Sequence, residues 1–404
     1  MAARRDNGDG SLFWSESRKL FIGAIYLPNG KRKQVTSKDK AACKAKLDAL
    51  KANIADGLDP HSDQVTVATW CKHWLESLAP KTVRPNTLAN YRAAVNTYIA
   101  PAIGRVKLHD LKPHHVREVH DAVAAAGRSS GTALNTHWAL SAALGAAVAE
   151  EMMVRNPCDR VKAPKVTRER RGALTVEQAQ CLLSTCMERD DPLVSRWAAA
   201  LMLGARQGEL LGLTWDRVDL VKRTANLEWA LDRLPMVHGC AGSCGAKWAS
   251  RCPRAVFDVE EWFEYIPLYK NLALVDPKSD RSRRVVPIPA PLAVLLEEHR
   301  DRSPENRHGL VWATDGGEPI DPGADLRAWK SAVQRAGLPP VVLHEARHST
   351  ASILLESGVD QGVIMAVLGH SSIITTRGYT HASDKLARAA LSNLDVLLED
   401  VSEG

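Results

Sequence analysis

The 404-residue sequence is poor in aromatic residues, has no long apolar run and uses little cysteine. Only 5% of the residues are Phe, Trp or Tyr, and six of them are tyrosines. The longest apolar stretches, such as residues 197–205, are far shorter than the ~20 residues that a membrane-spanning helix needs, which excludes an integral membrane protein. The first ten residues are charged and polar, without the apolar segment of a secretory signal, so the cytoplasm is the expected compartment.

The eight cysteines are too sparse for a disulfide scaffold, and reduced thiols are expected. The chain is too long for one ordinary core, so two to four domains are expected. The net charge of +6 is modest, but residues 1–60 hold twelve Lys and Arg against seven Asp and Glu. A basic end of this kind is either an electrostatic footprint for phosphate or a solvated tail.

Residues 1–60 are predicted to form a small αβ module. Three segments, 11–15, 19–27 and 31–36, have strand-like composition, and Pro28-Asn29-Gly30 predicts a hairpin between the last two. Residues 38–54 have the apolar spacing of a helix. The module is therefore predicted to be a three-stranded sheet with one helix.

Residues 64–160 are predicted to form a helical domain of four helices. The expected segments are Val67 to Leu78, ended by Ala79-Pro80, then 87–99, stopped by Pro101 and Gly104, then 112–126 and 132–150. Residues 161–173 are basic, contain a proline and indicate a linker. The predicted fold class is thus multidomain and mainly α, with small β-sheets.

Residues 174–404 have a mixed α+β pattern. Helices are predicted at 175–187, 193–204 and 207–211, and strands at 217–220, 224–231 and 283–288, with helices to the end. The last segment, after residue 385, has an apolar helical stripe, which would let it pack on its own core or dock on a neighbouring copy.

Five short elements of this region carry candidate chemistry. They are Gly204-Ala205-Arg206-Gln207-Gly208-Glu209, Pro277-Lys278-Ser279, Leu343-His344-Glu345-Ala346-Arg347-His348, Leu368-Gly369-His370-Ser371-Ser372 and Thr376-Arg377-Gly378-Tyr379-Thr380-His381. Each element alone fits a structural role, such as a capping ion pair or a helix end. In this order and rough spacing they closely resemble the tyrosine recombinase (phage integrase) family.

The resemblance implies a DNA strand transferase. Tyr379 would attack the scissile phosphate and leave a 3′-phosphotyrosyl link with a free 5′-hydroxyl. Arg206 and Arg347 would form a guanidinium clamp on the phosphate, and Glu209 would support the clamp. Lys278 would be the general acid for the departing 5′-oxygen. His344 would accept the phenolic proton, and His370 would donate a hydrogen bond to the phosphate. Two family positions differ, since Glu345 and Ala346 replace the usual Asp and Leu, which puts local packing in question but not activity.

The residue types suit phosphodiester cleavage without a metal or ATP. In the absence of Mg²⁺, permanently charged arginines must stabilise the transition state. No cofactor is therefore expected for the chemistry. Two rival functions remain, a type IB topoisomerase-like enzyme that reseals the same strand and a catalytically silent DNA-binding architectural or regulatory protein.

A cysteine-rich insertion at about 237–266 separates Arg206 from Lys278. It contains His238, Cys240, Cys244 and Cys252, a Cys₃His set that is sufficient for a structural zinc. Its spacing matches no common zinc-finger pattern, and reduced thiols without a metal are an equal alternative.

The resemblance also implies double-stranded DNA as the partner, bound by a clamp of the helical and catalytic domains. The N-terminal module resembles the arm-binding domains of larger integrases, which favours a phage or mobile-element integrase with both core and arm sites. The resemblance further implies a homotetramer on DNA, with host DNA-bending or directionality factors and a place on the host nucleoid. In that tetramer the family precedent favours docking of the last segment on a neighbouring copy over packing on its own core. The expected DNA contacts are Lys31, Arg32, Lys33, Lys162, Lys165, Arg168, Arg170 and Arg171.

Overall fold

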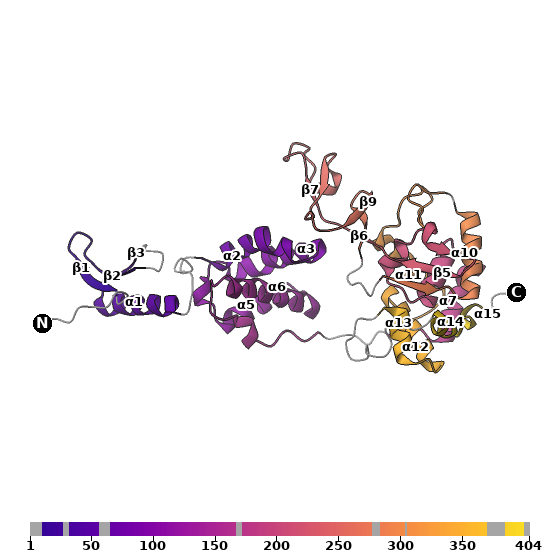
Figure 1. Cartoon of the computed structure of the whole chain (residues 1–404), viewed down its shortest axis with the longest axis horizontal. Helices are drawn as coiled ribbons and strands as arrows, with labels where there is room; N and C mark the ends of the chain where they lie inside the picture. Colours follow the sequence, from indigo (N-terminus) through magenta and orange to yellow (C-terminus); the bar gives the residue numbers. More distant parts are fainter. Residues whose placement is uncertain are drawn as a thin grey trace. The chain divides into compact units, whose positions relative to one another are not determined.

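The computed structural model describes residues 10–26, 32–55, 65–166, 172–276, 283–303, 305–369 and 384–399. The chain divides into two compact units, Met1–Thr167 and Arg168–Gly404. Figure 1 shows a small sheet followed by helices in the first unit, and a helical body with small sheets in the second. Across the described ranges, no helix is long and apolar enough to cross a bilayer. The predicted mainly α, multidomain fold class is confirmed.

The N-terminal module is an antiparallel sheet in the order β1-β2-β3, with one helix packed on it. Its elements are β1 (Ser11–Ser15), β2 (Leu20–Tyr26), β3 (Arg32–Ser37) and α1 (Lys40–Ala55). Ile25 of the sheet packs against Leu47 and Leu50 of α1 and forms a small core. The predicted sheet and helix are confirmed, while the predicted turn at residues 28–30 lies outside the described residues.

The rest of the first unit is helical. Its elements are α2 (Val67–His73), η2 (Trp74–Leu78), η3 (Ala79–Lys81), α3 (Pro85–Ala94), η4 (Val95–Ile99), α4 (Ala100–Ile103), η5 (Leu108–Asp110), α5 (Pro113–Ala125), α6 (Ser130–Ala149) and η6 (Pro157–Arg160). The central α6 packs against α2, α3 and α5. Its buried alanines allow close approach, and the Trp70 indole of α2 donates a 2.7 Å hydrogen bond to the Ala143 carbonyl.

The second helix predicted for the helical domain, at 87–99, continues past Pro101, where the sequence predicted that it would stop. A proline ring normally clashes with the carbonyl four residues earlier. Here the π-helical turn η4 intervenes, and the N–H of Ala100 bonds to the carbonyl of Val95, five residues back. This wider turn accommodates the ring and lets α4 follow. The π-helical turn η2 precedes Pro80 in the same way.

The second unit is built around α8, which is buried on every side from Ser195 to Met202. The described helices and turns are α7 (Val176–Glu188), α8 (Val194–Met202), α9 (Gln207–Leu211), η7 (Trp215–Arg217), η8 (Ala249–Arg251), α10 (Ala290–Arg302), α11 (Pro322–Arg335), α12 (Leu343–Glu356), α13 (Gln361–Leu368), α14 (Asp384–Ser392) and α15 (Val396–Glu399). Because α8 is rich in alanine, α7, α10 and α12 can all pack closely on it. These contacts form the core below the candidate site.

Short antiparallel strands complete this unit. They are β4 (Val218–Asp219), β5 (Thr224–Leu227), β6 (Ala230–Arg233), β7 (Met236–His238), β8 (Ala255–Phe257), β9 (Tyr265–Tyr269), β10 (Leu272–Val275) and β11 (Arg284–Pro287). The strand orders are β11-β5-β4, β6-β10-β9 and β7-β8.

The single strand predicted at 224–231 is wrong, because β5 and β6 pair with different partners. β5 pairs with β11, and β6 pairs with β10, both antiparallel. The β5–β11 and β6–β10 pairs follow one another along the same two antiparallel arms, and together they are called the interrupted hairpin. Residues 277–282, between β10 and β11, lie outside the described residues. The cysteine-rich insertion lies at the tip of this hairpin, between β6 and β10.

The C-terminal helices pack on the core of their own unit, which corrects the prediction that they dock on a neighbouring copy. Leu391, Leu394 and Leu397 are at most 1% exposed within this core. Helix α15 packs on α7, where the Gln180 side-chain amide donates to the Val396 carbonyl at 2.9 Å. The apolar stripe therefore has its partner within the same chain.

Candidate active site

A tight turn between α8 and α9 positions the first candidate residue, Arg206. Gly204 in this turn has φ = +54°, and a Cβ there would lie 2.3 Å from the Leu368 side chain, so only glycine fits. The turn leaves Arg206 at the N-terminus of α9. Its side chain is 41% exposed and can be reached by a ligand.

A buried carboxylate holds two arginines in place. Glu209, with 2% of its side chain exposed, accepts a hydrogen bond from Arg206 Nη1 at 2.7 Å and from the Arg206 backbone N–H at 2.9 Å. Arg284 at the start of β11 approaches the same carboxylate through Nη2 at 3.0 Å and Nη1 at 3.3 Å. Glu209 thus links α9 to the interrupted hairpin, as expected for a residue that orients a catalytic arginine.

Helix α12 supplies the second pair of candidates, His344 and Arg347. The Arg347 guanidinium is buried and donates from Nη1 to the Gly204 carbonyl at 2.8 Å. One turn later, the Thr350 hydroxyl donates to the Leu201 carbonyl at 2.7 Å. These two hydrogen bonds fix the start of α12 against the end of α8, close to Arg206.

The charges of this cluster show that its residues share one site. Burial, together with the positive charges of Arg206 and Arg284, lowers the pKa of Arg347 to about 10, so the guanidinium stays charged at neutral pH. Burial and the positive neighbours His348, Arg347 and Arg206 lower the pKa of His344. Three guanidiniums against the two carboxylates of Glu209 and Glu345 leave an excess of positive charge, which suits an anionic ligand.

Glu209 stays ionised despite its burial. Burial alone favours the neutral acid, but the charge and hydrogen bonds of Arg284, followed by the hydrogen bonds of Arg206, outweigh it and lower the pKa of Glu209. The acceptor that positions both arginines is therefore negatively charged at neutral pH.

The two residues that depart from the family pattern have structural roles here. The Glu345 carboxylate accepts a hydrogen bond from the Val342 backbone N–H at 3.1 Å and caps α12. Ala346 is 1% exposed and belongs to the core. Neither change displaces His344 or Arg347 from the helix face by the Gly204 turn.

Three expected catalytic residues, Lys278, His370 and Tyr379, lie outside the described residues. Described residues near two of them, Lys278 and His370, contact the site. Arg206 Nη2 donates to the carbonyl of Gly369, directly before His370, at 3.3 Å. Arg284, six residues after Lys278 in the sequence, is bonded to Glu209. The structure therefore brings together Arg206, Glu209, His344 and Arg347 among the predicted site residues.

The expected DNA contacts are only partly within the described residues. Arg32 and Lys33 lie on β3, where the Arg32 guanidinium stacks 5.9 Å from the Phe13 ring centre. Lys162 and Lys165 are exposed in the extended segment after η6. The other four, Lys31, Arg168, Arg170 and Arg171, lie outside the described residues.

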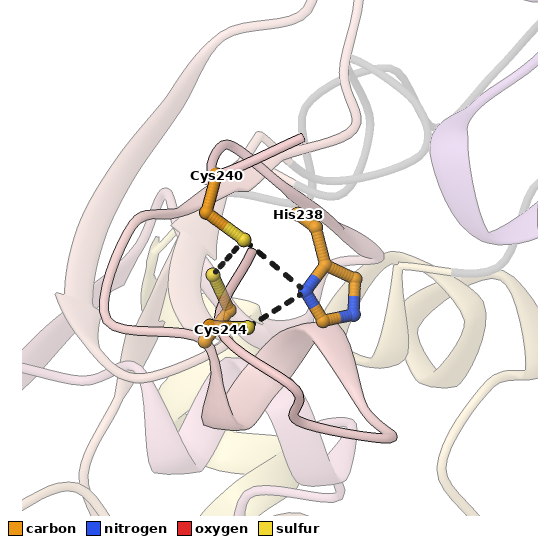
Figure 2. Close-up of side chains that lie close together, drawn as sticks. His238, Cys240 and Cys244 are labelled. Carbon is orange, nitrogen blue, oxygen red and sulfur yellow. Dashed lines mark hydrogen bonds between the residues drawn. The ribbon is translucent and has the colours of Figure 1, made fainter. Parts of the chain in front are cut away.

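The four expected metal ligands converge at the tip of the hairpin. Their ligand atoms all lie within 4.8 Å of one another. Figure 2 shows His238 Nδ1 facing two thiols, with Cys244 Sγ at 3.4 Å and Cys240 Sγ at 3.9 Å. Cys252 Sγ lies 3.4 Å from Cys240 Sγ. Hydrogen bonds from Cys244, its backbone first, lower the pKa of Cys240 to about 5.

Sequence reasoning missed two partners of the site. Arg284 was predicted only as part of the strand at 283–288, although it shares Glu209 with Arg206. A fully buried ion pair, Arg196–Asp325 at 2.9 Å, was not foreseen. Gln207, directly after Arg206, donates to the same Asp325 carboxylate at 2.8 Å. A buried arginine in an alanine-rich helix is the one signal that could have indicated a hidden carboxylate.

Comparison with known proteins identifies the family. The sequence model of the family described as "Phage integrase family" matches residues 262–385, which include Lys278, His344 and Tyr379. A second, "Phage integrase, N-terminal SAM-like domain", matches residues 66–123. An integrase of Saccharopolyspora erythraea is 31% identical over 97% of this chain and 97% of its own length. This chain belongs to the phage integrase family.

Other members of the phage integrase family are similar over most of the chain. A "Tyrosine recombinase XerC-like" protein of Caldanaerobacter subterraneus is 26% identical over 91% of this chain and 93% of its own. The Tn1549 transposon integrase, solved with a circular intermediate DNA, is 18% identical with a TM-score of 0.61 over 82% of this chain and 100% of its own. A lambda integrase dimer on a core site is 17% identical, with a TM-score of 0.54 over 92% and 95%. These structural likenesses concern the fold.

Proposed function

We propose that this integrase family member is a site-specific DNA recombinase, which cuts and rejoins strands through a 3′-phosphotyrosyl intermediate. One observation supports this most strongly. Arg206 and Arg284 share the buried carboxylate of Glu209, and Arg347 lies close enough to both arginines for their charges to lower its pKa, at a place where the chain is partly open to solvent. Such an excess of fixed positive charge suits a phosphodiester whose negative charge grows in the transition state.

The chemistry is assigned to residues as follows. The Tyr379 phenolic oxygen attacks the phosphorus and its proton passes to His344, which is neutral at pH 7 because its pKa is lowered. Arg206 and Arg347 hold the non-bridging oxygens. Lys278 gives a proton to the departing 5′-oxygen, and His370 hydrogen-bonds the phosphate. A 5′-hydroxyl then attacks the phosphotyrosine, and the phenol regains its proton.

The reaction needs neither ATP nor a metal. The phosphotyrosyl ester conserves the broken phosphodiester bond, so religation requires no external energy source. Arginines take the role that Mg²⁺ plays in many phosphoryl-transfer enzymes. We further propose that the metal of this protein is structural and sits at the Cys/His cluster of the insertion.

The assembly follows the same proposal. The helical and catalytic parts grip a core site, and the N-terminal module binds a separate arm site through Lys31, Arg32 and Lys33. Lys162, Lys165, Arg168, Arg170 and Arg171 track phosphates along the core site. Strand exchange takes place in a homotetramer on two DNA sites at the host nucleoid, with host bending and directionality factors as further partners.

A suicide substrate tests this function. A duplex carrying the protein's own recombination site, nicked next to the cleavage position, loses the short 5′-hydroxyl fragment after cleavage and traps the intermediate. We expect a covalent protein–DNA adduct in EDTA, visible on a denaturing gel, with the nucleotide mapped by mass spectrometry to the peptide of Tyr379. Loss of the adduct in EDTA, in a protein that is still folded, would refute the metal-free mechanism.

The same substrate separates the rival functions. A recombinase should convert two intact sites into exchanged products, whereas a topoisomerase-like enzyme would relax supercoiled DNA by reclosing the same strand without pairing two sites. A silent DNA-binding protein would shift the duplex on a native gel and form no adduct. Either of these last results would overturn the proposal.

The pH dependence of cleavage should report on His344. A proton acceptor must be neutral. Because the pKa of His344 is lowered from the ordinary imidazole value of about 6.5, His344 stays neutral until the pH falls below that value. The second-order rate constant of adduct formation should therefore stay flat from pH 8 to about 6.5 and fall only in more acid solution. We expect His348→Gln to move this acid limb to higher pH, because a positive neighbour of His344 is removed. An acid limb centred above pH 7 in the unmodified protein would contradict this role.

A further inference from the structure

The cysteine-rich tip is a separate small structure at the end of the interrupted hairpin. It runs from Pro235 to Trp262 and contains the β7–β8 pair and the turn η8. Figure 1 shows β7 projecting from the helical body of its unit. No residue of this tip has a role in the proposed strand transfer, so the tip must serve another purpose.

This tip has almost no apolar core. From Pro235 to Trp262, a stretch that is described throughout, the only buried residues are Cys240 and Cys252, at 8% and 6% exposure. Val237 and Val256, which face each other across the strand pair, are both about half exposed. So small a segment cannot bury enough apolar surface to hold its fold, and such segments are stabilised by disulfides or metals.

The backbone of the tip is shaped to bring the four side chains together. A Cβ at Gly239 would lie 2.2 Å from the Arg254 carbonyl oxygen, so only glycine permits this approach of the two strands. The Gly239 N–H donates to that same oxygen at 2.9 Å. The loop between Cys240 and Cys244 then turns through Gly242, whose φ of +84° suits glycine. These features converge on the sulfur atoms.

The separations of the ligand atoms fit a tetrahedral ion. Zn–S bonds of about 2.3 Å and Zn–N bonds of about 2.0 Å imply S···S distances of about 3.8 Å and S···N distances of about 3.5 Å. The corresponding distances here are 3.4 Å for Cys240 and Cys252, and 3.4 and 3.9 Å from His238 to Cys244 and Cys240. Both kinds of separation lie within half an ångström of the expected ones.

We propose that His238, Cys240, Cys244 and Cys252 bind one structural zinc ion, which folds the tip of the hairpin. Three thiolates and one imidazole are a ligand set of closed, four-coordinate zinc sites. All four positions are filled by the protein, so the ion has no open position for water and no catalytic role. The site is independent of strand transfer, and the two proposals can fail separately.

A Cys240–Cys252 disulfide is the main rival. Their sulfurs lie 3.4 Å apart, but a disulfide would require about 2.05 Å between them. It would also leave Cys244 and His238 facing each other at 3.4 Å without a reason for either residue. The four-ligand arrangement accounts for both.

Metal analysis of the full-length protein tests the proposal. Protein purified with zinc and without chelator should contain one zinc per chain by mass spectrometry, and Cys244→Ser should lose most of it. Cys181→Ser is the matched control, because Cys181 is exposed and lies outside the cluster, and it should keep one zinc. Equal zinc in wild type and Cys244→Ser would overturn the site.

Three further measurements test the remaining alternatives. Replacing zinc by cobalt should give the visible bands of a tetrahedral cobalt–thiolate site, absent in Cys244→Ser. Denatured protein, without reductant but with chelator, should show eight free thiols, whereas six with no metal would establish the disulfide. Chelation should speed hydrogen exchange in residues 235–262 and leave α8 unchanged, so unaltered exchange in the tip would refute a folding role.

Discussion

Replacing Tyr379 with phenylalanine is expected to abolish covalent attachment to DNA and leave DNA binding at the wild-type level. The change removes one oxygen, the atom that becomes bonded to phosphorus, and leaves the guanidinium clamp of Arg206 and Arg347 intact. Loss of a covalent nucleophile costs on the order of 10⁶ in rate in a well-studied protease. Adduct formation on the nicked substrate should therefore fall below detection, as measured on a denaturing gel beside a native-gel titration.

Tyr269→Phe provides the control for this experiment. Tyr269 belongs to the same unit, on β9, where its ring packs against the Lys270 ammonium at 4.7 Å, and its hydroxyl has no part in the proposed chemistry. This variant should form the adduct at the wild-type rate. A Tyr379→Phe protein that still forms an adduct would place the nucleophile on another residue, and a variant that also loses DNA binding would give Tyr379 a structural role.

The sequence could predict which candidate residues lie side by side where they are only three or four positions apart in the chain. Glu209 follows Arg206 by three residues and Arg347 follows His344 by three, so one helix places each pair whatever the rest of the fold does. Gly204 could likewise be predicted to mark a turn. The order of all five elements along the chain carried the family resemblance, and the structure brings these two pairs to one place.

Partners from distant parts of the chain could not be predicted. Arg284 reaches Glu209 across 75 residues, and Arg196 reaches Asp325 across 129. The same limit explains the strand wrongly predicted at 224–231, since its two halves are defined only by β11 and β10, which lie beyond the cysteine-rich insertion. Strand formation depends on the partner strand more than on local composition. Pro101 did not end its helix, because the preceding π-helical turn makes room for the proline ring. No pattern in the sequence indicated this turn.

Replacing Asp325 with alanine is expected to destabilise the second unit by about 3–5 kcal/mol. Arg196 and Asp325 are both fully buried, and their side chains meet at 2.9 Å in the centre of the unit. Burial lowers the pKa of Arg196, and the charge of Asp325 opposes this effect. Without the carboxylate, the guanidinium must stay charged and unpaired in the core or lose its proton, and either outcome is costly. Urea unfolding, followed by hydrogen exchange of α8 and α11, measures the loss.

The comparison with an exposed pair makes this expectation specific. Glu318→Ala removes the partner of Arg307, whose side chain is 62% exposed, and should change the unfolding free energy by no more than about 1 kcal/mol. Replacing both buried partners, Arg196→Met with Asp325→Leu, should restore much of the stability, because no charge is then left in the core. Asp325 also accepts from Gln207, the residue after Arg206. The double variant should therefore form the covalent adduct more slowly than the wild type even where its stability is restored. Adduct formation at the wild-type rate would show that the buried pair has no part in holding Arg206.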